Sequence, residues 1–342
     1  MQIRPIDVDD RAQFRRWYAI TREAWLFQRP DAPVWSRHEL QVALSRADGA
    51  ERLTAYGAFD GENMQAAAMI AVPLVDNLDK VNLYVWVAPS LRRQGIGGAL
   101  LEHLVSASVR EGRTTMLAES WLPQDARADH PYHRFACKHG FALANTQIRR
   151  TLALPVPNDR LEALAAEARD HHPDYRIQTY VDDVPKGLLA SYCHLRNQVG
   201  LDAPTGDVAL EARALTPEIV LRRQAIAKEQ GRTTYLAFAV EPGGEAVAYT
   251  SLVAPDKDRV YVYQSGTLVR RDHRGHRLGL AVKVANLVSL QQRCPGRRFV
   301  NTENAEVNGL MVQINEKLGF RPVEVLAEFQ RMVSAATATV PA

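Results

Sequence analysis

Hydrophobic and polar residues in the first half of the chain alternate between helical and strand-like spacing. Helical spacing and apolar runs of strand length predict an ordered series of elements. In order, these are helices over 11–24 and 36–46, strands over 53–59, 66–72 and 81–87, a helix over 99–110, a strand over 115–118, a helix that ends near His139, and a strand over 147–154. The pattern indicates an α/β domain built on a mixed sheet.

The second half repeats this order of elements. They are helices over 187–199 and 217–230, strands over 233–240, 246–253 and 260–269, a helix over 280–292, a strand over 299–302, a helix over 308–318, and a strand near 327–333. Such a repeat indicates two copies of one supersecondary arrangement. The fold class expected is therefore α/β with two similar domains in tandem.

Two kinds of landmark recur at nearly the same offset. An arginine that follows a strand stands at Arg92 and again at Arg274, 182 positions later. A glycine that ends a helix before a strand stands at Gly140 and again at Gly319, 179 positions later. Because both offsets are close to half of the chain, we interpret the sequence as a duplicated domain.

Prolines mark the expected boundary between the two copies. Pro155 and Pro157 discourage both helix and central strand. We therefore expect an N-terminal domain over 1–154, a linker over 155–174 that contains a bridging helix, a C-terminal domain over 175–334, and a frayed tail over 335–342.

Composition narrows the function classes. The 342 residues are 46% hydrophobic and carry a formal charge of +3, an excess too small for a nucleic-acid-binding face. No apolar run reaches the length of a membrane span or a signal peptide, so a cytoplasmic protein without membrane contact is expected. The three cysteines form no Cys-x-x-Cys pair, and we expect neither disulfides nor a metal site.

A glycine-rich and arginine-bearing turn connects a strand to a helix in each half. In the first half Arg92 and Arg93 precede Gly95 and Gly97. The unpaired N–H groups of a first helical turn and the helix dipole favour an anion there, and glycines allow it to approach the backbone. A dinucleotide-binding fingerprint has a third glycine and an acidic residue about 20 positions later, and the spacing of this turn does not match it. We therefore expect a pyrophosphate-binding loop outside the Rossmann class.

This turn, Arg92-Arg93-Gln94-Gly95-Ile96-Gly97, resembles the acetyl-CoA loop of the GNAT acetyltransferase superfamily. The second half, with 273–279, 301–304 and Leu318-Gly319-Phe320, resembles the C-terminal half of tandem GNAT proteins of actinobacterial type. The resemblance covers about 3–332. It implies two tandem GNAT domains and an acetyl-CoA-dependent N-acetyltransferase with a small-molecule amine as acceptor. Because the halves can pack as a pseudo-dimer, a monomer or a weak homodimer is expected.

The resemblance also implies which residues hold acetyl-CoA. In the first half they are Val85, Trp86, Val87, Arg92, Arg93, Gln94, Gly95, Ile96, Gly97 and Gly98. In the second half they are Thr267, Leu268, Val269, Arg274, Gly275, His276, Arg277, Leu278, Gly279, Leu280, Asn304 and Asn308. The second set departs from the family at Arg277, which stands where the first glycine is expected.

Catalytic candidates follow from the chemistry of amide formation, which needs a base for the amine and an acid for the thiolate. The tyrosine that the family often places four residues before the helix-ending glycine is replaced by Ala136 and Asn315. Glu119 and Glu303 occupy corresponding positions at the ends of the two strands that follow the loops and are candidate bases, although the interpretation favoured for each is a solvated strand-end carboxylate. Asn315 is a third catalytic candidate, because its amide could hydrogen-bond the thioester or the thiol. The missing tyrosine keeps two alternatives open, a non-catalytic acyl-CoA-binding protein and a peptide or protein N-acetyltransferase.

Overall fold

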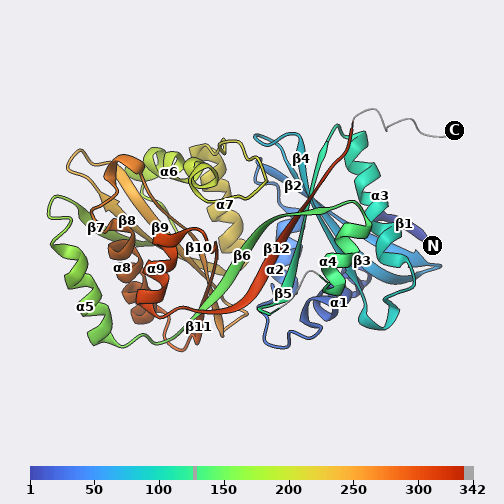
Figure 1. Ribbon diagram of the computed structural model, residues 1–342, viewed down its shortest axis with the longest axis horizontal. Coiled ribbons are helices and arrows are strands. Elements are labelled where there is room, and N and C mark those ends of the chain that lie inside the picture. The colour runs from blue at the N-terminus through green and yellow to red at the C-terminus, as the bar shows by residue number, and fades with distance from the viewer. Residues whose placement is uncertain (126–128, 335–342) are drawn as a thin grey trace. The chain divides into compact units, whose positions relative to one another are not determined.

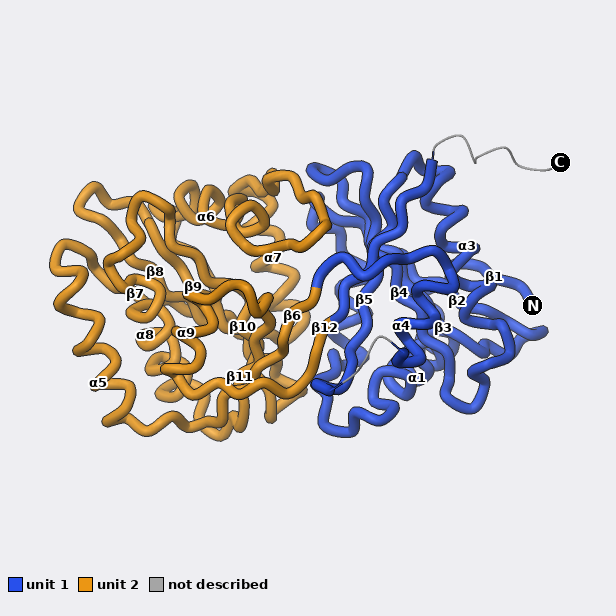
Figure 2. The backbone as a smooth tube through the Cα atoms, in the orientation of Figure 1, with its two compact units in different colours: residues 1–145, 327–342 blue, residues 146–326 orange. Residues whose placement is uncertain are grey.

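The computed structural model describes residues 1–125 and 129–334, and the expected frayed tail at 335–342 lies outside the described residues. The chain forms two compact units, coloured blue and orange in Figure 2. Unit 1 comprises Met1–Asn145 and Ala327–Ala342, and unit 2 comprises Thr146–Leu326. Each unit is an α/β structure with a mixed sheet, which confirms the expected fold class.

Unit 1 contains one sheet in the order β1-β2-β3-β4-β5-β12. Neighbouring strands from β1 to β4 are antiparallel, and β4 and β5 are parallel. Its elements are β1 (Gln2–Pro5), α1 (Arg11–Leu26), α2 (Arg37–Ser45), β2 (Glu51–Asp60), β3 (Asn63–Pro73), β4 (Lys80–Val87), α3 (Ile96–Arg110), β5 (Thr115–Pro123), α4 (Pro131–Lys138), the beginning of β6 (Ala142–Ala153) and the end of β12 (Arg321–Met332).

Unit 2 repeats this arrangement with the strand order β7-β8-β9-β10-β11-β6. Here β10 and β11 are the parallel pair. Its elements are most of β6, α5 (Asn158–Arg169), β7 (Arg176–Val181), α6 (Leu189–Asp202), α7 (Pro217–Glu229), β8 (Arg232–Val240), β9 (Ala246–Pro255), β10 (Tyr261–Val269), α8 (Leu278–Arg293), β11 (Phe299–Ala305), α9 (Gly309–Leu318) and the beginning of β12.

The two repeats exchange their last strands. β6, the last strand of the first repeat, lies mostly in unit 2, and β12, the last strand of the second repeat, ends in unit 1. β12 is the neighbour of β5, and the red end of the chain in Figure 1 accordingly lies among the blue and cyan strands of unit 1. β6 in turn pairs antiparallel with β11, from Phe299 opposite Ala153 to Ala305 opposite Gln147. The compact units therefore differ from the expected limits 1–154 and 175–334. The helix expected to bridge the halves is α5, which belongs to unit 2.

The core of unit 1 forms where α1 packs against the sheet. Asp10 caps α1 by accepting hydrogen bonds from the Ala12 and Gln13 N–H groups. Trp17, which is fully buried, donates from its indole N–H to the carbonyl oxygens of Tyr56 (3.1 Å) and Ala68 (3.2 Å). These bonds satisfy the indole while its ring is buried, so they fix how α1 lies on β2 and β3.

The core of unit 2 is centred on α8, which is covered by the sheet on one side and by α5 on another. Leu161 and Ala168 of α5 join Val284 and Leu287 of α8 in one buried cluster. α8 also buries Lys283. At the position 182 residues earlier, α3 of unit 1 carries the apolar Leu101.

The parallel strand pair separates part of the way along its length in each unit. In unit 1, β4 and β5 pair from Lys80 opposite Thr115 to Leu83 opposite Ala118. Beyond this point β4 stays paired only with β3, as far as Ala66 opposite Val87. In unit 2, β10 and β11 pair from Tyr261 to Tyr263. Each unit therefore exposes one backbone edge of its fourth strand to a ligand, next to the glycine-rich turn.

Candidate functional site

The turn after β4 presents backbone N–H groups at the start of α3. A short 3₁₀ turn (Pro89–Leu91) is followed by two residues with positive φ, Arg93 (66°) and Gly95 (84°). The first α-helical bond is donated by the Ala99 N–H to the Gly95 carbonyl at 3.1 Å. The N–H groups of Ile96, Gly97 and Gly98 therefore precede the helical ladder and are free to bind an anion.

Arg92 adds positive charge beside these amides. Its Nε donates to the carbonyl oxygen of Val87 at 3.3 Å, and its Nη1 donates to the Tyr132 hydroxyl at 3.1 Å. The guanidinium also lies 4.3 Å from the centre of the Phe27 ring. Among the described residues no carboxylate pairs with Arg92 or Arg93, and Arg93 is exposed. Unit 1 therefore has a cationic loop whose charge is available to a ligand.

The edge of β4 next to this loop was predicted to bind the donor through Val85, Trp86 and Val87. The structure leaves these three residues half-buried. The Trp86 side chain stacks on Tyr84 with ring centres 5.9 Å apart, and it meets Trp17 edge-on at 5.8 Å. Trp86 is thus part of the core, and its contribution to the edge comes from its backbone.

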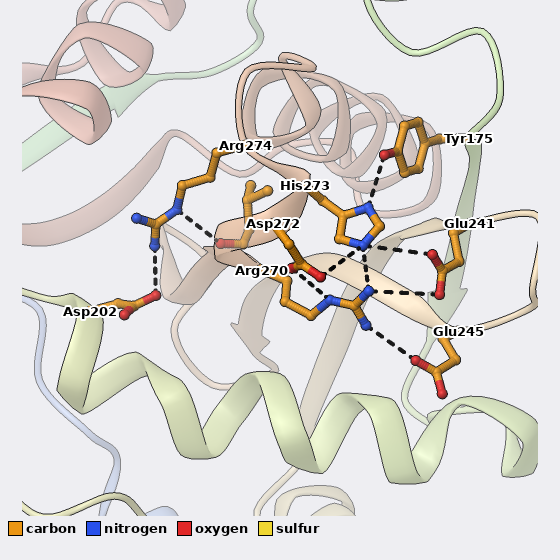
Figure 3. Close-up of polar contacts among 9 residues, drawn as sticks. Tyr175, Asp202, Glu241, Glu245, Arg270, Asp272, His273 and Arg274 are labelled. Carbon is orange, nitrogen blue, oxygen red and sulfur yellow. Dashed lines mark hydrogen bonds and ion pairs between the residues drawn. The ribbon is translucent and has the colours of Figure 1, made fainter.

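The corresponding loop of unit 2 has a similar backbone but different electrostatics. Arg274 donates from Nε to the Val269 carbonyl at 3.3 Å, as Arg92 does to Val87. Figure 3 shows that its Nη2 meets Asp202, the last residue of α6, at 2.6 Å. Arg271 pairs with the same carboxylate at 2.5 Å. Asp202 therefore pairs with both arginines from within the unit, and its single negative charge offsets one of their two positive charges.

The remaining charged residues of this loop are also held by the protein. Arg277, which has a positive φ of 52° in the position expected for glycine, forms an ion pair with Glu167 of α5. His276 lies 3.1 Å from the carbonyl oxygen of His171 through Nδ1. A hydrogen bond from Lys317, together with the charge of Arg277, lowers the pKa of Glu167. The loop is thus tied to α5 by side chains that would otherwise face an anion.

His273 lies behind this loop in a polar cluster (Figure 3). Its Nδ1 is 2.9 Å from the Tyr175 hydroxyl, and its Nε2 faces Glu241 at 3.6 Å and Asp272 at 3.4 Å. The deeper residues Leu278, Gly279 and Leu280 are buried. Thr267 bonds Thr250 through their hydroxyls at 2.7 Å, and Leu268 is buried. Among the donor-binding residues expected in this loop, Gly275 is exposed.

The two candidate bases lie at matching positions on the strands that follow the helices α3 and α8. Glu119 lies in β5, just beyond the point where the pairing of β5 with β4 ends. Burial raises the pKa of the Tyr84 hydroxyl, and the charge of Glu119 is a smaller cause of the same shift. Desolvation raises the pKa of the Glu303 carboxyl, and Arg149 opposes this shift. Arg149 itself pairs with Glu324 at 2.5 Å. Glu303 therefore lies near both a positive and a negative side chain.

Asn315 is fully buried and faces another amide. Its Nδ2 donates to Asn304 Oδ1 at 3.2 Å, and Arg150 donates to the same oxygen at 3.3 Å. The Asn315 Oδ1 has no hydrogen-bond partner among the described residues. Asn308 precedes α9 without a side-chain capping bond. Asn304 and Asn315 thus belong to an internal network rather than to the loop surface.

Comparison with known proteins agrees with this architecture. Residues 14–141 match the acetyltransferase (GNAT) family. A solved structure described as a tandem GNAT protein from the clavulanic acid biosynthesis pathway is 23% identical, with a TM-score of 0.76, and the alignment covers 100% of this chain and 99% of that one. Residues 14–141 thus match a GNAT domain, and the whole chain has the fold of a tandem GNAT protein.

Two further solved structures share this fold. A GCN5-related N-acetyltransferase from Sphaerobacter thermophilus is 14% identical over 97% of this chain and 95% of that one, with a TM-score of 0.60. A glucosamine N-acetyltransferase region of a fungal multi-domain β-N-acetylglucosaminidase is also 14% identical, with a TM-score of 0.64, over 96% of this chain and 38% of that one. The search among curated protein sequences finds no match.

Two searches of the described residues gave negative results. No helix within 1–125 or 129–334 is both long and apolar enough to cross a membrane. In the same residues no group of three or more histidine, cysteine, aspartate or glutamate side chains could hold a metal ion.

The local motif that predicts the two loops does not include the residues that contact their arginines. Phe27 and Tyr132 hold Arg92, and Asp202 and Glu167 neutralise the second loop. All four are distant in sequence from the loops they contact. Two acidic residues on helices offered no local signal that they would pair with arginines 69 to 110 positions away.

Proposed function

We propose that the protein transfers an acetyl group from acetyl-CoA to the amine of a small molecule, with the donor bound at the loop of unit 1. The observation that carries this proposal is the difference between the two loops. In unit 1 the three leading amides of α3 lie beside Arg92 and Arg93, which have no carboxylate partner among the described residues. In unit 2, Asp202 and Glu167 already neutralise Arg274 and Arg277.

The residues of unit 1 fit a CoA thioester in two places. The amides from Ile96 to Gly98 and the guanidinium groups suit a pyrophosphate, because charge-assisted bonds to backbone N–H and arginine are strong. The open edge of β4 beside Val85 and Val87 offers N–H and C=O groups to the amides of a pantetheine arm, in the manner of an added strand. Donor binding thus uses the backbone of the region where β4 and β5 separate.

Glu119 is the group we assign as general base. In the transfer, the amine nitrogen bonds to the thioester carbonyl carbon, the C–S bond breaks, and CoA leaves as a thiolate that takes up a proton from water. Glu119 accepts the proton that the amine loses, directly or through a water molecule. Its exposed position just beyond the β4–β5 ladder leaves its carboxylate accessible to an incoming amine.

The deciding experiment is a turnover assay with acetyl-CoA and a broad panel of small amines, following release of free thiol. We expect saturable, amine-dependent release. Saturable binding of acetyl-CoA without turnover on small amines or on peptides would indicate the non-catalytic acyl-CoA-binding protein, which Ala136 in the place of the family's tyrosine favours. Turnover with peptides alone would indicate the peptide N-acetyltransferase.

Arg92→Ala is expected to lower the affinity for acetyl-CoA about 10-fold, because it removes a charge-assisted contact to the donor. Arg274→Ala is the matched control, since Arg274 makes the same bond to the preceding strand but faces Asp202. We expect its affinity to stay within 2-fold of the unmodified protein, as measured by isothermal titration calorimetry. A larger effect at Arg274 than at Arg92 would place the donor in unit 2.

The same proposal includes an acceptor, a location and an assembly state for the protein. A small-molecule amine is the acceptor, and no nucleic acid or membrane takes part. Because acetyl-CoA is an intracellular metabolite, we propose a cytoplasmic location. A monomer with two similar halves, or a weak homodimer, is the expected assembly, and sedimentation equilibrium measures it directly.

A further inference from the structure

His139, the residue that ends α4, lies against the first turn of α3 in unit 1. A Cβ atom built on Gly98 would be 2.8 Å from Cε1 and 3.0 Å from Nε2 of His139. Gly98 carries the last N–H before the helical ladder begins. The imidazole edge therefore packs against Gly98, one of the three residues whose amides we assign to the donor pyrophosphate.

Two charged residues fix the orientation of this imidazole. His139 Nδ1 lies 3.1 Å from Glu102 Oε1, one turn further along α3. Arg331 of β12 donates to the same Glu102 oxygen at 2.9 Å and to the His139 carbonyl oxygen at 3.1 Å. Because a carboxylate only accepts, Nδ1 carries the hydrogen in this contact, and the Nε2 edge is turned toward Gly98.

Unit 2 has no such group. The positions that correspond to Gly98 and Glu102 at an offset of 182 are Leu280 and Val284, and the residue before its helix-ending glycine is Leu318. All three are buried in the apolar core of unit 2. The polar set therefore occurs in the unit whose loop arginines, Arg92 and Arg93, have no carboxylate partner among the described residues, and apolar residues occupy the corresponding positions of the other unit.

We infer that His139 is an additional ligand of the donor pyrophosphate in unit 1, with Glu102 and Arg331 as positioning residues. The inference rests on the proposed function, since it adds a side chain to the donor site of unit 1. With Nδ1–H bonded to Glu102, Nε2 is the ring nitrogen that remains for an anion beside Gly98, and it donates in the imidazolium form, whose charge the Glu102 carboxylate helps to compensate. Gly98 is required at this site because any side chain there would displace the imidazole.

The test compares His139→Leu, which copies Leu318 of unit 2, with His139→Gln, which keeps an N–H donor. Affinities for acetyl-CoA and for its 3′-dephospho form are measured by calorimetry, with thermal unfolding recorded for each variant. We expect His139→Leu to weaken both ligands about 5- to 10-fold, since both contain the pyrophosphate. His139→Gln should recover at least half of that loss on a logarithmic scale.

The other outcomes are distinct. Unchanged affinity in His139→Leu overturns the inference, and so does an equal loss in both variants together with a lower melting temperature, which would indicate packing alone. If His139→Leu loses affinity only for acetyl-CoA, which has the 3′-phosphate, His139 contacts that phosphate instead, and this result also overturns the inference. Absence of acetyl-CoA binding by the unmodified protein would refute the proposed function itself.

Glu102→Gln tests the positioning role separately. The amide preserves size but no longer compensates a charged imidazole, so we expect about a 3-fold loss of affinity in a background with His139. In a His139→Leu background the same substitution should have no further effect on affinity, because the group that Glu102 orients is gone. Additive losses would contradict the role of Glu102 through His139.

Discussion

Glu119→Gln is expected to lower kcat for amine acetylation by about 100-fold or more while leaving the affinity for acetyl-CoA unchanged. A positioned general base contributes roughly 10²–10⁴ to such a reaction, and glutamine keeps the size of the side chain without accepting a proton. Steady-state kinetics with a responsive amine, combined with calorimetry of donor binding, measures the two quantities separately. An affinity loss equal to the kcat loss would point to a structural effect.

Glu303→Gln is the matched control, since Glu303 occupies the parallel position in unit 2. Its carboxyl lies beside Arg149 and Glu324. Because the donor loop of unit 2 is neutralised internally, we expect kcat to stay within 2-fold of the unmodified protein. If both variants retain full activity, the two glutamates are solvated strand-end carboxylates, and the proton leaves through water.

The repeat could be predicted from the sequence because its landmarks are local. Arg92 and Arg274 each bond the carbonyl oxygen that ends the preceding strand. Gly140 and Gly319 both adopt positive φ, 74° and 101°, directly after a helix, where glycine is favoured. The chemistry at each landmark depends on a few adjacent residues, which is why two offsets sufficed to identify a duplicated fold.

Short strands and the exchange of the last strands could not be predicted. β1 and β7 span four and six residues, too few for a period-2 pattern to stand out from the flanking turns. β6 and β12 were located approximately, but alternation fixes which face a strand buries and not which neighbour it pairs with. Their partners β11 and β5 follow from the path of the whole chain.

The candidate site likewise combines features that a local motif predicts with features that depend on the folded chain. The amides and glycines of the first loop follow from a local motif, and the departure at Arg277 was visible in the sequence. Its consequence was not, because it depends on Glu167 of α5. His139 is adjacent to the glycine landmark, yet its role depends on Gly98 and Arg331, which only the folded chain brings together.

Lys283→Met is expected to stabilise unit 2, and the gain should depend on pH. Lys283 is only 2% exposed, donates to Gln264 Oε1 at 3.1 Å, and lies 5.4 Å from the centre of the Phe320 ring. Burial lowers the pKa of this amine to about 7. The folded state therefore binds fewer protons than the unfolded state from about pH 7 up to the ordinary pKa of lysine, ~10.4.

The sign follows from this difference. Stability rises with pH where the unfolded state binds more protons, so the stability of the unmodified protein should increase by up to roughly 1.4 kcal/mol per pH unit in this window. Below about pH 7 the cost of charging the buried amine is fully present. Methionine does not titrate, and Leu101 at the equivalent position of unit 1 shows that an apolar side chain is accommodated there. The advantage of Lys283→Met should thus be greatest below pH 7 and vanish near pH 10.

Urea unfolding at pH 6, 8 and 9.5 measures this dependence, and the chain supplies its own internal control. All five tryptophans, Trp17, Trp25, Trp35, Trp86 and Trp121, belong to unit 1. Tryptophan fluorescence therefore reports unit 1, and far-ultraviolet circular dichroism reports both units. Lys283→Met should shift a dichroism transition but leave the fluorescence transition in place if the units unfold independently. A gain that is the same at all three pH values would mean that the effect comes from packing at α8 rather than from the buried charge.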